Sequence, residues 1–270
     1  MPELPEVETT MRGVAPLLVG ERLTKIEVRR PDLRWPIPVD FRQRLQGATV
    51  TRVGRRAKYG LIETDRGDSV ILHLGMSGRL RLDPEDDQKH DHVLIETAKA
   101  RVALNDPRRF GSLHIVETDQ LETHPLIAAC GPEPLGPDFD ADHLRAVTKG
   151  SQSPMKALLL DGRRVAGLGN IYVCEALHEA GVRPTRKGAR LTKREAARLT
   201  DSIRAVLTRA IAAGGSSLRD YAQPSGELGY FQHDFRVYGR EGEACHGCGA
   251  PVRRIVQSAR STFYCPLCQK

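Results

Sequence analysis

Four cysteines near the end of the chain have the spacing of a metal site. Cys245 and Cys248 form one C-x-x-C pair, and Cys265 and Cys268 form a second. Each pair lets two thiolates reach one ion from a tight turn, and two pairs complete a closed tetrahedral set. The pattern therefore predicts one structural Zn²⁺, with no position open for water. Two disulfides or a redox dithiol are the alternatives, and the lack of a secretory signal favours zinc.

The N-terminal stretch MPELPEVETT carries a second set of reactive groups. Removal of Met1 would expose the secondary amine of Pro2, close in sequence to the carboxyl groups of Glu3 and Glu6. A secondary amine beside an acid is the one feature here that a helix start does not explain. The plainer interpretation is a well-started helix, because proline and acids both favour a first helical turn.

Composition and charge limit the class of protein. The chain has 270 residues and a net charge of +7. Residues 183–209 contain nine Lys or Arg and only two acids. This balance predicts a polyanionic partner such as a nucleic acid. No apolar run reaches the roughly 18 residues of a membrane span, and no signal peptide is evident, so we expect no membrane partner and a cytoplasmic location.

The first half of the chain predicts a helix followed by many short strands. Val7, Met11, Val14 and Leu18 fall on one face of a helix that Gly20 can close. Short strands with turn signals between them indicate a sandwich or barrel. The β-type runs lie at residues 28–30, 48–53, 59–64, 69–74, 93–97, 101–105 and 112–118. The stretch GPEPLGPDFDAD, rich in Gly, Pro and Asp, predicts a linker.

Helical signals dominate the second half. Ser153 is an expected N-cap before Pro154, and Asn170 is the expected cap of a helix that runs to Gly181. Thr192 and Glu195 have the spacing of a capping box before a long amphipathic helix. The segment between the cysteine pairs predicts a β-hairpin that displays three arginines, Arg253, Arg254 and Arg260. A hairpin this small needs the metal in order to fold.

Six motifs together resemble the formamidopyrimidine-DNA glycosylase family, the bacterial repair enzymes that excise oxidised purines. They are MPELPEVETT, RRAKYG, HLGMSG, DPRRFG, GLGNIYVCEAL and TFYCPLCQK, in the family's order. The resemblance runs from residue 2 to residue 270 and implies an α+β fold. An N-terminal helix and β-sandwich would form a catalytic domain over residues 1–130, followed by a linker over 131–150. A helix–two-turns–helix DNA-binding domain would span 151–235, and a zinc-finger β-hairpin 236–270.

The resemblance also implies catalytic roles. Pro2 would attack C1′ of the damaged nucleotide, and the resulting iminium would acidify C2′ and permit β,δ-elimination. Glu3 would be the general acid and base, and Glu6 would orient the amine or water. Lys58 would help to keep the amine neutral and would hold a phosphate. Arg260 would complete the catalytic set, aimed into the minor groove by the zinc hairpin.

Damaged duplex DNA is the implied partner, bound by a monomer. A flipped base leaves a hole, which Met76, Arg108 and Phe110 would fill. Phosphate contacts are expected from His73, Lys156 and Asn170, together with Lys58 and Arg260. The loop at 214–231 resembles the segment that closes over the flipped base, with backbone N–H groups from residues 217–221.

Plainer roles remain open for several of these residues. Met76 and Phe110 could be core residues, Lys58 a solvated strand residue and Asn170 only a helix cap. The long loop could be an ordinary surface loop. The HDH triplet at 90–92 is expected to be structural rather than a second metal site. Cys130 and Cys174 are expected to be buried and reduced.

Three alternative functions follow from the same residues. One is the endonuclease VIII type, which acts on oxidised pyrimidines, begins with MPEGPE and lacks these wedge residues. A catalytically silent DNA-binding protein would require changes at Pro2, Glu3 or Lys58, and none is changed. An RNA- or ribosome-binding zinc ribbon would leave the N-terminal motif unexplained.

Overall fold

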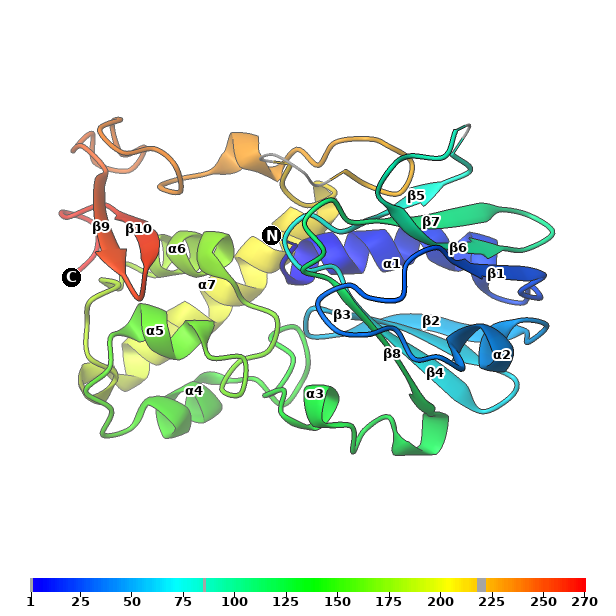
Figure 1. Cartoon of the computed structure of the whole chain (residues 1–270). Helices are drawn as coiled ribbons and strands as arrows, with labels where there is room; N and C mark the ends of the chain where they lie inside the picture. The colour runs from blue at the N-terminus through cyan, green and yellow to red at the C-terminus, as the bar shows by residue number, and fades with distance from the viewer. Residues whose placement is uncertain (1, 85, 218–221) are drawn as a thin grey trace. The chain divides into compact units, whose positions relative to one another are not determined.

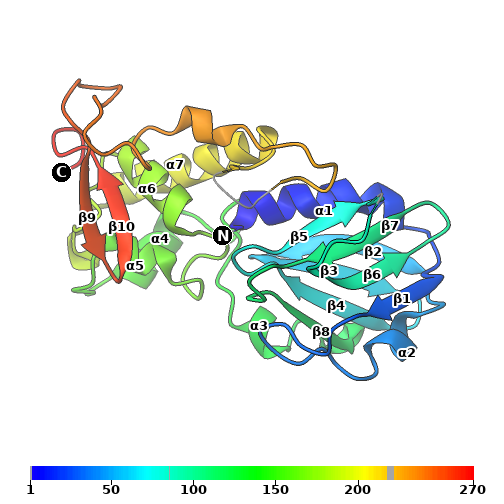
Figure 2. The same cartoon turned by 45° about the horizontal axis from the view of Figure 1, so that its top comes forward.

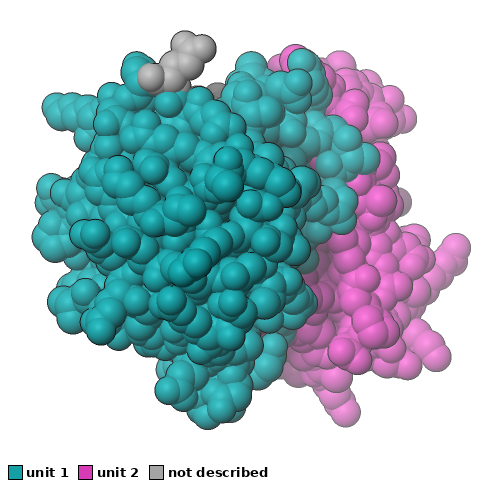
Figure 3. All heavy atoms as spheres, turned by 90° about the vertical axis from the view of Figure 1, so that its right-hand side faces the viewer, with its two compact units in different colours: residues 1–128, 211–230 teal, residues 129–210, 231–270 magenta. Residues whose placement is uncertain are grey.

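The computed structural model describes residues 2–84, 86–217 and 222–270 (Figure 1). The chain divides into two compact units, coloured separately in Figure 3. Unit 1 comprises residues 1–128 and 211–230, and unit 2 comprises residues 129–210 and 231–270. Sheets dominate unit 1, whereas helices and one hairpin make up unit 2, so the predicted α+β class is confirmed. Within the described ranges, no helix has the length and apolar character that crossing a membrane requires.

Two four-stranded antiparallel sheets form the sandwich of unit 1 (Figure 2). One sheet has the order β1-β6-β7-β5, and the other has the order β2-β3-β4-β8. The strands are β1 (Lys25–Val28), β2 (Val50–Arg56), β3 (Tyr59–Thr64), β4 (Asp68–His73), β5 (Arg79–Leu82), β6 (Asp91–Glu96), β7 (Arg101–Asn105) and β8 (Ser112–Glu117). The runs expected at 59–64 and 101–105 coincide with β3 and β7, whereas β5 was not expected.

Strand β4 shows how burial on both faces shapes the sequence. Val70 and Leu72 belong to the core between the sheets, and Ile71 packs into a second cluster with Leu121 and Ile127. Successive side chains point to opposite faces of a sheet, so burial on both faces requires apolar residues at every position. The uninterrupted apolar run ends at His73, which is thereby placed at the rim of the sheet.

Helix α1 (Leu4–Leu18) packs against both sheets and confirms the predicted apolar face. Val7, Met11, Val14 and Leu18 are all buried in the sandwich core. The helix contacts β2 and β3 of one sheet and β5 of the other. The approach to β3 is close, because a Cβ added at Gly60 would lie 2.5 Å from the Met11 sulfur. Packing on two sheets fixes where α1 begins, and with it Pro2 and Glu3.

The remaining helices are short except for the last. They are α2 (Phe41–Leu45), α3 (Pro125–Ala128), α4 (Ala141–Thr148), α5 (Met155–Leu160), α6 (Asn170–Glu179) and α7 (Lys193–Ala212), with 3₁₀ turns η1 (Thr118–Gln120), η2 (Gly188–Arg190) and η3 (Phe231–Asp234). The expected hairpin is present as β9 (Arg253–Gln257) and β10 (Arg260–Tyr264). Within unit 2, α6 packs against α5 and β10 (Figure 1).

Two helix starts differ by one residue from the sequence prediction. The N-cap of α5 is Pro154 rather than Ser153, and that of α6 is Gly169 rather than Asn170. Asn170 is the first helical residue, and its side-chain amide donates to the Ser261 carbonyl at 3.0 Å. The capping box before α7 is confirmed, since Thr192 and Glu195 exchange side-chain-to-backbone hydrogen bonds.

The stretch predicted as a linker is held in place within unit 2. Residues 131–150 contain α4, and Phe139 is completely buried. The Arg204 guanidinium, on α7, donates to the carbonyls of Pro134, Gly136 and Phe139. The Gly- and Pro-rich composition therefore corresponds here to a fixed loop, because one buried ring and one arginine anchor its backbone.

Candidate active site and zinc site

The N-terminal residues form a buried start to α1. Pro2, Glu3 and Glu6 are all buried, and Met1 lies outside the described residues. The Glu3 N–H donates to Glu6 Oε2 at 2.9 Å, which is one half of a capping box. The helix therefore begins with two carboxylates beside Pro2, near the positive end of the helix dipole.

Glu6 also binds a segment more than two hundred residues away. Its Oε1 accepts hydrogen bonds from the Ser216 N–H at 2.8 Å and from the Ser216 hydroxyl at 3.0 Å. Gly214 and Gly215 precede this serine with positive φ angles of 74° and 81°, which shape the chain for the approach. Sequence reasoning missed this contact, although the Gly-Gly-Ser signal lay in the loop that it had singled out.

A hydrogen bond joins the two ends of that loop. The Ser217 hydroxyl accepts a hydrogen bond from the Gly229 N–H at 2.9 Å. Residues 218–221, to which a role in covering the flipped base was assigned, lie outside the described residues. The anchor at Ser216 therefore ties the beginning of the loop to the N-terminal site.

Lys58 and His73 lie close together at one end of the β2-β3-β4 sheet. Lys58 is half-buried in the turn from β2 to β3, and its neighbour Tyr59 pairs with His73 across β3 and β4. Burial, followed by the charges of Lys58 and Arg34, lowers the pKa of His73 to about 4. Its Nδ1 accepts a hydrogen bond from the Gly75 N–H at 3.1 Å, so the neutral ring carries its proton on Nε2.

The three predicted wedge residues lie on two loops with exposed tips. Met76 is 39% exposed and Phe110 is 42% exposed, and Arg108 is also exposed. The alternative interpretation, that Met76 and Phe110 are core residues, is therefore wrong. The Arg108 guanidinium stands 4.9 Å from the centre of the Phe110 ring, within cation–π range. Arg109 has a φ of 55°, and its Nη1 lies 3.9 Å from Asp32 Oδ2. Arg108 is therefore the arginine whose side chain contacts the Phe110 ring.

A buried carboxylate holds these two loops together. Asp106 accepts hydrogen bonds from the Ser77 hydroxyl at 2.6 Å and from the Gly111 N–H at 2.8 Å. The Ser77 oxygen in turn accepts from the Arg108 N–H at 3.1 Å. The loops touch through their backbones, because a Cβ at Gly75 would lie 2.3 Å from the Phe110 carbonyl carbon. The two loops are therefore positioned as one rigid feature.

Two residues in unit 2 that were predicted to contact phosphate hold the hairpin. Lys156 is 1% exposed, and its ammonium donates to the Ser261 carbonyl at 2.9 Å and to the Thr262 hydroxyl at 2.6 Å. Asn170 donates to the same Ser261 carbonyl. These two hydrogen bonds give Lys156 a positioning role, and its phosphate contact stays a prediction. Both residues fix β10 next to exposed Arg260.

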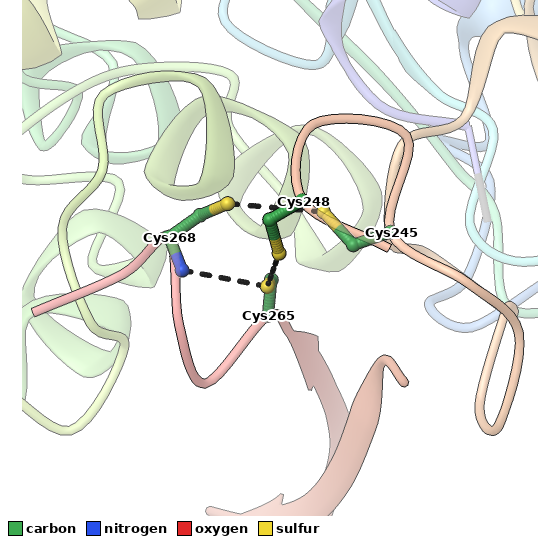
Figure 4. A group of neighbouring side chains, drawn as sticks. All are labelled: Cys245, Cys248, Cys265 and Cys268. Atoms are coloured by element: carbon green, nitrogen blue, oxygen red, sulfur yellow. Dashed lines mark hydrogen bonds between the residues drawn. The ribbon is translucent and has the colours of Figure 1, made fainter. Parts of the chain in front are cut away.

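The four cysteines come together as predicted (Figure 4). All four sulfurs lie within 4.8 Å of one another, with 3.9 Å between Cys245 and Cys268 and 3.4 Å between Cys248 and Cys265. Zinc bonds of about 2.3 Å in a tetrahedron place sulfurs roughly 3.8 Å apart, so the set fits one Zn²⁺. Hydrogen bonding to Cys248 and burial raise the pKa of Cys268 to about 12, so a cation is needed to keep this side chain as a thiolate.

The HDH triplet and the two cysteines outside the cluster do not form a second metal site among the described residues. The cysteine set is the one group of its kind among the residues that the structure describes. In the HDH triplet, Asp91 pairs with Arg81 at 2.7 Å and His92 bonds the Asp106 carbonyl at 2.9 Å, which confirms a structural role. Cys174 is buried as expected, whereas Cys130 is half-buried because it lies in the loop that leads into unit 2.

Sequence comparisons match almost the whole chain to one family. Residues 1–113 match the formamidopyrimidine-DNA glycosylase N-terminal domain, and residues 130–222 match its H2TH domain. Residues 242–270 match a zinc finger found in FPG and IleRS. Curated proteins named formamidopyrimidine-DNA glycosylase are 60% identical in Rhizorhabdus wittichii and 59% identical in Novosphingobium aromaticivorans, with full coverage of both chains.

Solved structures agree with these matches. The MutM (Fpg) protein of Thermus thermophilus superimposes with a TM-score of 0.90 at 41% identity, over 99% of this chain and 98% of that one. A Lactococcus lactis FPG mutant in complex with Fapy-dG-containing DNA gives a TM-score of 0.93 at 37% identity, with full coverage of both chains. The zinc finger, the H2TH region and the N-terminal domain thus occur together and in order, and the chain belongs to the formamidopyrimidine-DNA glycosylase family.

Proposed function

We propose that this chain excises oxidised purines from duplex DNA through a Pro2 iminium and then cleaves the strand by β,δ-elimination. Its family makes it a DNA glycosylase and AP lyase of base excision repair. The observation that carries the Pro2 assignment is the buried start of α1, where Pro2 adjoins Glu3 and Glu6. Relatives bound to Fapy-dG-containing and abasic-site DNA support damaged duplex DNA as the substrate.

The proposed reaction uses the neutral amine of Pro2. Its lone pair forms a bond to C1′, and the C1′–N bond to the base breaks with the electron pair leaving on the base, which takes up a proton. The attacking nitrogen then loses its proton, and the C1′–O4′ bond breaks with O4′ taking up a proton. The product is an iminium whose nitrogen has no proton to lose. Loss of a C2′ proton expels the 3′ phosphate, and a further elimination expels the 5′ phosphate. Glu3 is the group that carries these protons.

Electrostatics favour the neutral amine. The N-terminus of α1 carries a partial positive charge, which disfavours a protonated amine at the same place. Lys58, at the end of the sheet on which α1 packs, adds a second cation. Glu6 is held by the Glu3 and Ser216 N–H groups, so we assign it to positioning the start of α1 against the loop rather than to chemistry.

The exposed loops serve base flipping. Met76 and Phe110 are apolar tips that can fill the vacated stack, and Arg108 can hydrogen-bond the orphaned partner base. His73 is neutral, with its proton on Nε2, so it contacts phosphate as a hydrogen-bond donor and not as a cation. Arg260 supplies a charge from the zinc hairpin. The enzyme acts as a monomer, because one flipped base needs one site. Its place of action is the cytoplasm, on the nucleoid.

Borohydride trapping tests the nucleophile. We expect the protein to form a covalent adduct at Pro2 on a duplex that carries 8-oxoguanine opposite cytosine, identified by mass spectrometry of the linked peptide. Retention of Met1 should abolish it, because the Pro2 nitrogen is then an amide. Glu3→Gln is the matched variant, expected to slow excision by about 10²–10⁴-fold while duplex binding persists.

Other outcomes of the trapping would point to the alternatives. An adduct on a lysine would keep the lyase and overturn the Pro2 assignment. Absence of any adduct, with duplex binding retained, would indicate a catalytically silent DNA-binding protein. Faster excision of an oxidised pyrimidine than of 8-oxoguanine would indicate the endonuclease VIII type.

A further inference from the structure

A histidine from α6 reaches the cysteine cluster. His178 lies in the last turn of α6, and its Nε2 is 3.5 Å from the Cys245 sulfur. Cys245 is buried, so this contact is shielded from water on the sulfur side. We propose that His178 donates a hydrogen bond to the zinc-bound Cys245 thiolate and thereby slows the loss of zinc. His178 is thus a positioning residue and not a metal ligand.

The direction of the hydrogen bond follows from the chemistry of its two partners. A zinc-bound thiolate carries no proton and can only accept, so the contact requires an N–H on Nε2. The other ring nitrogen, Nδ1, is buried and has no partner among the described residues. A buried N–H without an acceptor is the more costly arrangement, so the ring carries its proton on Nε2. The surroundings of both ring nitrogens therefore favour the same tautomer, with the proton on Nε2.

The hydrogen bond offsets a charge imbalance. Four thiolates and one Zn²⁺ sum to a charge of −2, held partly inside the protein. Donors directed at the sulfurs reduce the charge on them, and outer-sphere partners of this kind commonly change metal affinity by about 10–100-fold. The Cys268 N–H, which lies 3.4 Å from the Cys265 sulfur, is a second such donor. His178 supplies one to Cys245 from outside the zinc-finger segment.

Helix α6 is placed to transmit this effect, because it holds the zinc segment at two further points. At its start, Asn170 binds the Ser261 carbonyl on β10. In its middle, the Glu175 carboxylate accepts hydrogen bonds from the N–H groups of three successive residues that lead into the zinc finger, at 2.8–3.0 Å: Arg236, Val237 and Tyr238. At its end, His178 contacts the ligand itself. One helix thus positions the hairpin, the segment at 236–238 that leads into the zinc finger, and the metal site.

A groove open to solvent gives chelators a route to the cysteine cluster. The groove has a volume of about 510 Å³, and His178, Gly181, Arg198, Cys268 and Lys270 help to line it. It therefore opens beside one zinc ligand and beside the proposed outer-sphere donor. Loosening the Cys245 thiolate should accordingly appear as faster transfer of zinc to a competitor in solution.

Zinc transfer from the full-length protein to a coloured chelator, pyridylazoresorcinol, tests the proposal. We expect His178→Phe to release zinc about tenfold faster than the wild type, and His178→Gln to lie close to the wild type because its amide can still reach the sulfur. The matched control is His143→Phe. The Nε2–H of His143 donates to the Arg164 carbonyl at 2.8 Å, and His143 is far in sequence from the cysteines. It should leave zinc release unchanged.

Cobalt substitution gives a second readout that a merely structural role would not move. Loss of the hydrogen bond should shift the thiolate-to-cobalt charge-transfer band of His178→Phe to lower energy, with tetrahedral ligand-field bands retained. An unshifted band together with wild-type zinc release would overturn the proposal. If His178→Phe does not fold, His178→Gln and His178→Asn decide, because the shorter Asn cannot reach the sulfur. Equal release rates for these two variants would also overturn it.

Discussion

The surroundings of single side chains decide their protonation and charge in this protein. His73 is the clearest case, because burial and the charge of Lys58 lower its pKa to about 4. The imidazole is therefore neutral at pH 7, and the phosphate contact that we propose for it would use its N–H as a hydrogen-bond donor. Lys156 shows the opposite arrangement, since its charge is buried but stabilised by the Ser261 carbonyl and the Thr262 hydroxyl. The surroundings of a basic side chain thus decide whether it is neutral or holds a buried charge.

The pKa of His73 predicts a specific pH dependence of stability. The ordinary value is 6.5, so as the pH falls the unfolded chain takes up this proton before the folded chain does. Its contribution to the free energy of unfolding is full above pH 6.5 and declines towards pH 4, by at most about 3 kcal/mol. Urea unfolding at several pH values should show a flatter decline in His73→Asn. Parallel pH profiles for the two proteins would contradict the expectation.

Elements act in this protein through their ends and connections. The proposed wedge comprises two loops, one after β4 and one after β7, which are held together by Asp106 and by a close approach at Gly75. The N-terminal site likewise depends on the start of α1, which Glu6 ties to Ser216. Sheets and helices thus supply rigid positions, and the chemistry lies where they stop.

Gly75→Ala tests whether the two wedge loops need this approach. Its φ is 64°, and the new Cβ would meet the Phe110 backbone, so we expect a loss of about 3 kcal/mol in the free energy of unfolding and slower excision. Gly20→Ala is the matched control in the same unit. Gly20 has a φ of 81° but nothing within 4 Å, so its loss should be the strain alone, about 1 kcal/mol. Equal urea midpoints for the two variants would contradict the role of the contact.

At the scale of the whole molecule, the proposed DNA contacts come from both compact units. Lys58, His73 and the wedge belong to unit 1, whereas Arg260 and the zinc site belong to unit 2. The zinc hairpin has few buried apolar residues of its own, so the metal supplies much of its folding free energy. The sandwich of unit 1 has a separate apolar core and does not need the metal.

Removal of zinc should therefore affect DNA binding and leave the sandwich folded. We expect chelation to lower duplex affinity and to reduce the slope of log Kobs against log salt by about 1, because Arg260 no longer contacts a phosphate. Zinc-loaded Arg260→Gln is the control and should show the same reduction in slope. Hydrogen exchange should show that β3, β4 and β7 stay protected. An unchanged slope after complete zinc removal would contradict a phosphate contact by Arg260.

The sequence by itself determined the features that depend on local spacing. The two C-x-x-C pairs specify four ligands that come within 4.8 Å of one another, and alternating or continuous apolar runs specify β3, β4 and β7. The motif order also led to the family. These features could be predicted because the residues that make them are neighbours along the chain, so their geometry follows from backbone conformation.

Only the tertiary structure decided which distant residues meet. Glu6 and Ser216 are 210 residues apart, and Lys156 and Ser261 are 105 residues apart, so neither contact leaves a local signal. The same holds for His178 beside Cys245, and for the loop at 131–142 that Arg204 fixes. Contacts of this kind depend on how whole elements pack, because burial and hydrogen bonding select among the many partners that a local pattern permits.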